Sequence, residues 1–269
     1  MARNRRLQRQ RAKNRWGLLI LLVVVLAAVG IGVGSWYLQR HTVTLNPDTL
    51  CPADGPRALT VILVDRTDRL NTVQREAVRV RLDEVRAQTA QYGGIALFSI
   101  GPTEHELLRP EAYLCNPGTV TEASPLYQNT RRVEQRWQTF IQRLEQAFET
   151  AVQAGEQPAS PIMESIQSAA LSTFARAAPH TPKRLIVVSD LLQHSPALSL
   201  YQRLPRFADF KTTEAFRQLR APLTGVEVEI LYLRRPTTRA IQGKALIEFW
   251  QQYLGENGGL LARVVSIEG

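Results

Sequence analysis

Between residues 59 and 267 the sequence alternates short apolar runs with longer amphipathic stretches. The first run, Leu59–Val64, is almost continuously apolar and rich in β-branched residues, which is typical of a strand buried on both faces of a parallel sheet. Arg184–Ser189 predicts another buried strand, and further strands are predicted at Ile95–Ile100, at Gly225–Leu233, which alternates and then runs apolar, and at Leu260–Ile267. Glu106–Leu114 predicts one more strand, which we expect to be antiparallel because it returns after a turn at Gly101–Pro102.

Stretches with helical spacing separate these runs. They predict helices at Thr72–Tyr92, Thr130–Ala154, from Ser160 to about Pro179, near Thr213–Leu219 and at Thr238–Leu254. In the third helix, Ser160 is suited to the N-cap and Pro161 to the first turn. The alternation of strands and helices without internal repeats predicts a doubly wound α/β domain, with a mostly parallel sheet and helices on both faces in a Rossmann-like arrangement.

An uncharged apolar stretch of 22 residues, Gly17–Leu38, precedes this domain. It is long enough to cross a hydrocarbon core of about 30 Å as a helix, with Trp16, Trp36 and Tyr37 at its ends. A cleaved signal peptide is the alternative, but secretory apolar regions usually run about 7–15 residues. We therefore predict one transmembrane helix. Gly30 and Gly34 form a GxxxG pattern through which two such helices could associate.

Most of the net charge of +9 comes from the first 16 residues, which hold seven Lys/Arg and no acid. Removing these seven from the 33 basic residues leaves 26 against 24 acidic ones, so the rest of the chain is nearly neutral. This distribution argues against nucleic-acid binding. By the positive-inside rule, the basic residues place the tail in the cytoplasm and the domain on the other side of the membrane. This topology suits a single-pass protein of a bacterial inner membrane with a periplasmic or extracytoplasmic domain.

The predicted organisation is a basic cytoplasmic tail (1–16), a transmembrane helix (17–38), a linker rich in proline and glycine (39–58) and the α/β domain (59–269). Two cysteines, Cys51 and Cys115, both fall on the non-cytoplasmic side. An even count in an oxidising compartment permits one disulfide, and both could approach the same sheet edge. We expect that bridge, with two buried free thiols as the alternative.

Oxygen-bearing side chains lie where predicted strands end. Asp65 and Asp190 each follow a buried strand, Thr67 comes two residues after the first, and Ser160 lies at a helix start. Because ligands bind at the carboxyl ends of strands in open α/β sheets, these four residues are candidate ligands for a hard cation such as Mg²⁺. Alternatively, Asp65 and Thr67 cap a helix and Asp190 caps a turn.

The order of these features resembles the von Willebrand factor A family over roughly residues 55–268. Asp65–Arg69 falls where that family carries a DxSxS metal-ion-dependent adhesion motif, Ser160–Ile166 looks like its threonine-containing loop, and Val188–Asp190 looks like the segment that ends in its third-motif aspartate. The resemblance implies a cation at the carboxyl edge of the sheet, whose coordination a partner protein's acidic side chain completes.

This sequence departs from the motif at Arg69, where the family has serine. An arginine there would repel a divalent ion, or its guanidinium would replace one. We therefore predict a non-enzymatic, membrane-tethered interaction domain that binds another protein of an envelope assembly through a surface around the candidate ligands. The candidate partner-binding residues are Asp68, Arg69, Asn116, His194 and Ser195.

An envelope hydrolase acting on phosphoesters or cell-wall material is the competing hypothesis. His194 and Ser195 near Asp190 suit acid–base chemistry, but adjacent residues seldom form a triad, and no G-x-S-x-G pattern surrounds Ser195. Asp65 lacks the second aspartate, two residues on, that a haloacid dehalogenase site requires, because Thr67 stands there. The absence of a glycine-rich phosphate loop makes an ATPase a poor fit.

Overall fold

The computed structural model describes residues 16–17, 20–36, 43–67, 69–101, 107–122, 129–153 and 158–269. The chain divides into two compact units, Met1–Thr44 and Leu45–Gly269. In the first unit, residues 20–36 are helical. Among the described residues, no helix has both the length and the apolarity to span a membrane. The predicted basic tail lies almost wholly outside the described residues, as do residues 18–19 and 37–38 of the predicted span.

The second unit is built on one six-stranded sheet with the order β3-β2-β1-β4-β5-β6. Its strands are β1 (Leu59–Asp65), β2 (Gly94–Ile100), β3 (Ala112–Cys115), β4 (Lys183–Ser189), β5 (Val226–Leu233) and β6 (Leu260–Ile267). All neighbouring pairs are parallel except β2–β3, so the predicted antiparallel strand is confirmed, although it is shorter than predicted. The chain reverses its winding direction between β1 and β4, which makes their junction the topological switch point of the sheet.

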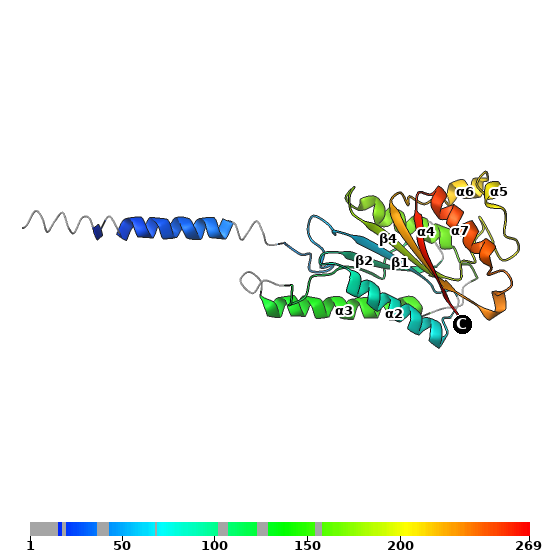
Figure 1. Ribbon diagram of the computed structural model, residues 1–269, viewed down its shortest axis with the longest axis horizontal. Coiled ribbons are helices and arrows are strands. Elements are labelled where there is room, and N and C mark those ends of the chain that lie inside the picture. Colours follow the sequence, from blue (N-terminus) through cyan, green and yellow to red (C-terminus); the bar gives the residue numbers. More distant parts are fainter. Residues whose placement is uncertain are drawn as a thin grey trace, which may run out of the picture. The chain divides into compact units, whose positions relative to one another are not determined.

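Helices cover both faces of the sheet (Figure 1). They are α2 (Thr72–Gln88), α3 (Thr130–Val152), α4 (Ile162–Ser172), α5 (Phe207–Phe210), α6 (Glu214–Gln218) and α7 (Lys244–Glu256), with short 3-10 turns η1 (Phe174–Arg176) and η2 (Pro236–Thr238). Alternate residues of each central strand enter opposite cores: Leu63 packs in the core beneath α4 and α7, whereas its neighbour Val64 packs beneath α2 and α3. The predicted doubly wound architecture is therefore confirmed.

Two helix starts differ from the sequence prediction. The helix predicted from Ser160 begins at Ile162, and Pro161 occupies the N-cap without a side-chain hydrogen bond. Ser160 instead pairs its backbone with that of His194, so it cannot adopt the N-cap geometry. The last helix begins at Lys244, because a separate 3-10 turn and a loop precede it.

The segment assigned to the linker belongs in part to the folded unit, which begins at Leu45. Leu50 is buried, and Cys51 forms a disulfide with Cys115 across a Cα–Cα distance of 4.7 Å. The disulfide prediction is therefore confirmed. The segment has no apolar periodicity, but this covalent link and a hydrogen bond from Cys115 N to Thr49 O hold it against the edge of the sheet.

A buried ion pair joins α2 to β5. The Glu229 carboxylate accepts hydrogen bonds from Arg81 Nε at 2.9 Å and Arg81 Nη2 at 2.7 Å, and from Arg184 Nη2 at 2.6 Å. Burial alone would raise the pKa of Glu229, but its hydrogen bonds with Arg81 and the charges of both arginines outweigh burial and hold that pKa below its ordinary value. The pair keeps a charged residue in the buried part of β5.

Candidate functional site

The candidate site lies at the carboxyl ends of β1 and β4, the neighbouring strands at the switch point. Asp65 is the last residue of β1, and Asp190 directly follows β4. Both carboxylate side chains are buried, at 1% and 3% exposure. The parallel register of the two strands therefore brings together residues that lie far apart in the sequence, as the sequence analysis predicts.

Asp65 is the hub of a hydrogen-bonded cluster. Its Oδ1 accepts from the backbone N of Thr67 at 3.0 Å and from Thr67 Oγ1 at 2.6 Å. Its Oδ2 accepts from Ser160 Oγ at 3.2 Å and from Ser189 Oγ at 2.8 Å. One buried carboxylate thus ties together the loop after β1, the segment before α4 and the end of β4.

Asp190 is held by a different set of groups. Its Oδ1 accepts from the backbone N of Leu192 at 2.9 Å, and its Oδ2 forms an ion pair with Arg235 Nε at 3.6 Å. Arg235 Nη1 donates to the backbone O of Arg69 at 2.8 Å, which links the loop after β5 to the loop after β1. The buried Gln242 fixes this loop, because its Oε1 accepts from Arg235 N and its Nε2 donates to the backbone O of Asp190.

His194 lies beside the cluster on the Ser160 side. Its backbone and that of Ser160 form a two-way antiparallel bridge at 2.8 Å. The imidazole Nδ1 is 2.9 Å from Ser199 Oγ, and the ring meets Tyr201 edge to face. These residues and Thr67 line an open pocket of about 240 Å³. The loop after β4 thereby places an aromatic ring and a titratable ring next to the Asp65 cluster.

The structure brings together most of the predicted site residues. Asp65, Thr67 and Ser160 are in direct contact, and Asp190 and Arg69 are linked through Arg235. Ser195 supports its own loop, since its Oγ accepts from Gln193 Nε2 and Ala197 N. Asp68 lies outside the described residues.

The structure does not bring Asn116 to this site. It follows β3, and β3 is antiparallel, so its carboxyl end lies at the amino-terminal edge of the other strands. There the buried Asn116 side chain donates to Thr89 O and accepts from Gly118 N. Asn116 therefore lies at the opposite edge of the sheet from the other predicted partner-binding residues, and its side chain bonds within the fold.

Sequence reasoning missed three residues of the site: Ser189 beside Asp65, and Arg235 and Gln242 beside Asp190. The sequence gives a weak indication of Ser189, because this residue precedes Asp190 at a predicted strand end and therefore lies at the same sheet edge. The indication of Arg235 is clearer, because the pair Arg234–Arg235 directly follows the apolar run of β5 and so lies at the carboxyl end of a strand. Gln242 lies seven residues further on in a loop, and no sequence signal marks it.

The residues of this cluster do not fit a directly bound divalent cation. A carboxylate offers about four lone-pair positions, and Asp65 uses four of them for hydrogen-bond donors. A guanidinium already faces Asp190. A divalent ion about 5 Å from Arg235 would be repelled by roughly 7 kcal/mol at an effective dielectric constant near 20. Within the described part of the chain, no group of three or more His, Cys, Asp or Glu residues could hold a metal.

A scan against protein-family models finds no match, and a search of curated proteins also finds none. Among solved structures, the chain is similar to the SpRpn10 VWA domain, with 12% identity, a TM-score of 0.43 and coverage of 78% of this chain and 88% of that one. It is also similar to the conserved hypothetical protein BatB from Bacteroides thetaiotaomicron, with 13% identity, a TM-score of 0.39 and coverage of 79% and 91%. Likeness at this identity concerns the fold alone.

Proposed function

We propose that the chain is a membrane-anchored, extracytoplasmic interaction domain that binds another protein at the carboxyl edge of its sheet. The Asp65 cluster carries this proposal, because it ties together three loops that border one surface. Loops fixed in this way lose little conformational entropy on binding. The uncharged stretch Gly17–Leu38 and the basic tail before it support the anchor.

The chemistry of this edge suits an acidic partner segment. Arg69 is exposed, and the Arg235 side chain retains 12% exposure beside Asp190. Tyr201 is 41% exposed next to His194. Arginine and tyrosine are enriched among residues that dominate binding energy, and a guanidinium can pair a carboxylate in two-pronged geometry. A partner carboxylate would thus meet arginine rather than a metal ion.

We propose a binding role rather than a catalytic one. His194 contacts Ser199 and not the adjacent Ser195, and both oxygens of Asp65 accept hydrogen bonds within the protein. A nucleophilic carboxylate needs a free oxygen facing the substrate. The hydrolase alternative therefore gains no support from the geometry.

The proposed contact surface can be tested with the full chain expressed in the bacterium that produces it, so that the partner of the envelope assembly is present. A photo-crosslinking amino acid at Tyr201 is expected to capture a discrete partner, whereas the same probe at Thr121, exposed near the opposite sheet edge, is not. Charge reversal by Arg69→Glu should abolish the Tyr201 adduct, and EDTA should leave it unchanged. Equal adducts from both positions, or an adduct indifferent to Arg69→Glu, would contradict the proposal.

The anchor needs a separate test. The full chain should stay in the membrane pellet after an alkaline carbonate wash, whereas a chain that lacks residues 1–40 should be released. Protease added outside intact spheroplasts should digest residues 45–269. Full protection, with digestion only after lysis, would place the domain in the cytoplasm and overturn the proposed orientation.

A further inference from the structure

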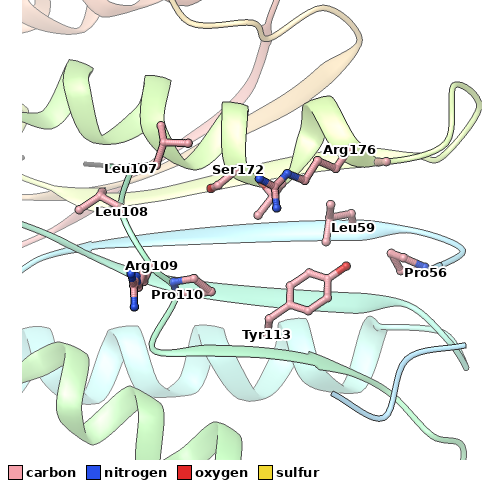
Figure 2. A pocket seen from close by; sticks show the side chains of 11 residues that line it. Pro56, Leu59, Leu107, Leu108, Arg109, Pro110, Tyr113, Ser172 and Arg176 are labelled. Atoms are coloured by element: carbon pink, nitrogen blue, oxygen red, sulfur yellow. The ribbon is translucent and has the colours of Figure 1, made fainter. Parts of the chain in front are cut away.

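A second pocket lies away from the Asp65 cluster, at the amino-terminal end of β1. It has a volume of about 720 Å³ and is open to solvent on one side. The end of α4 and η1 form one wall, and edge strand β3 with residues 107–110 forms the other (Figure 2). Small-molecule sites usually have volumes of roughly 300–1,000 Å³, so this pocket is of a size that holds a small ligand.

Apolar side chains form the floor and one end of the pocket. Leu59 lies on the floor and faces the ring of Tyr113, and Leu107 and Leu108 stand at the end far from Pro56 (Figure 2). Leu107 remains 47% exposed, so part of this apolar lining has no cover from the protein itself. A ligand with an apolar body would remove that surface from water, at about 25 cal/mol for each Å² buried.

Two arginines give the pocket its charge. The side chain of Arg176 reaches back from η1, with its guanidinium near Ser172 and Leu59, and Arg109 lies beside Pro110 (Figure 2). Within the described residues, no acidic side chain pairs with either guanidinium. The Tyr113 hydroxyl points into the space between Leu59 and Pro56 (Figure 2). The Arg176 guanidinium and the Tyr113 hydroxyl can both donate hydrogen bonds to an anion in the pocket.

The walls of the pocket are fixed before any ligand arrives. The backbone N of Leu108 donates to Ser168 Oγ at 2.6 Å, which fastens the outer segment to α4. Tyr113 is paired with Ala96 in the sheet, and β3 ends at the Cys51–Cys115 disulfide. Such a preformed site pays little ordering entropy when it binds.

We propose that this pocket binds a small amphiphilic carboxylate. Its apolar body would lie over Leu59 and Tyr113, and its carboxylate would pair with Arg176. The pocket is separate from the proposed protein-binding surface, because Leu59 begins β1 and Asp65 ends it. Binding of the carboxylate therefore does not depend on the proposed partner.

The test compares three probes of equal chain length with the purified full chain: octanoate, octanol and octylammonium. Calorimetric titration is expected to show saturable octanoate binding and much weaker binding of the other two. Arg176→Gln should weaken octanoate binding about tenfold, the loss expected for one charge-assisted hydrogen bond, and leave octanol binding unchanged. Arg176→Lys should restore part of the affinity.

Two variants separate a specific pocket from general attraction to a basic protein. Arg220→Gln removes an equal charge at an exposed position outside the pocket lining and should leave octanoate binding unchanged. Ala177→Phe narrows the pocket at its lining and should block octanoate. Equal affinity for octanol and octanoate, equal losses in Arg176→Gln and Arg220→Gln, or no binding up to the solubility limit would each overturn the proposal.

Discussion

Arg235 Nε lies 3.6 Å from Asp190 Oδ2, at the ends of two neighbouring parallel strands. The sequence comparison draws attention to Arg69 as the residue that conflicts with a cation, but the guanidinium that faces the aspartate belongs to Arg235. Arg69 contributes its backbone carbonyl to the same arginine. The positive charge at this edge is thus covalently part of the protein, whereas the family resemblance implies a dissociable metal ion.

Metal removal should therefore leave the domain unchanged. We expect EDTA or added Mg²⁺ to shift the melting temperature of the full chain no more than an equal ionic strength of Na⁺. Arg235→Ala removes the charge next to Asp190 and should allow Mn²⁺ to raise the melting temperature of the variant. Arg239→Ala, which lies on the same loop and pairs with Glu268 at 3.8 Å, is the matched control. A Mg²⁺-dependent rise in the wild type would contradict this account.

Replacement of Asp65 should destabilise the domain more than loss of any single hydroxyl around it. In Asp65→Asn, one carboxylate oxygen becomes an NH₂ group that cannot accept, and it faces either the two Thr67 donors or the hydroxyls of Ser160 and Ser189, so we expect a loss of about 3 kcal/mol in the free energy of unfolding. Ser160→Ala removes one partner and should cost about 1 kcal/mol. Urea unfolding measures both, and equal losses would show that Asp65 is not the hub.

The pH dependence of stability should reveal Glu229. Its pKa in the folded protein lies below the ordinary value of 4.5, so the folded state favours the ionised form. The stability it contributes is fully present above that ordinary value and is lost as the pH falls through the folded-state pKa. Wild type should therefore lose more stability than Glu229→Gln between neutral pH and about pH 3.

At neutral pH the same Glu229→Gln change should cost about 3 kcal/mol, because Arg81 and Arg184 then lose the buried carboxylate that they share, and Arg81 keeps the half-exposed Glu84 as its partner. Glu227→Gln, an exposed position on the same strand, is the control and should be close to neutral. Parallel pH profiles for wild type and Glu229→Gln would rule out this role.

Two glycines should respond in opposite ways to alanine. A Cβ at Gly94 would lie 3.1 Å from Pro56 Cβ and 3.2 Å from Leu59 Cδ1, so Gly94→Ala should cost about 1–3 kcal/mol by overpacking. At Gly255, within α7, a Cβ meets no atom within 4 Å, and alanine should stabilise the helix by about 0.5–1 kcal/mol. Thermal unfolding of both variants measures this contrast, and destabilisation by Gly255→Ala would contradict it.

The fold was predictable because the central strands β1, β2 and β4 are buried along most of their length. The run Leu59–Val64 is apolar at nearly every position, and its alternate residues serve two cores, so the pattern fits a central parallel strand and little else. Leu260–Ile267 was predicted to the residue. Helix starts were harder, because Ser160 has the chemistry of an N-cap but its backbone is used in the bridge to His194.

The site was predictable only where residues lie at strand ends. The positions of Asp65 and Asp190 follow from strand register alone. Arg235 and Gln242 could not be placed, because their roles depend on how the loop after β5 folds back over β4. Asn116 lies away from the other predicted site residues for a topological reason: β3 is antiparallel, so the loop that follows it lies at the opposite edge of the sheet.

The Cys51–Cys115 disulfide also determines how the domain would bear a mechanical load applied through the segment before Leu45. Tension on that segment reaches Cys51 and passes through a covalent bond into β3, at the amino-terminal edge of the sheet. The loops around Asp65, at the other end of β1, lie outside this path. In a domain tethered as proposed, a pull on the segment before Leu45 would leave the proposed partner-binding surface in shape.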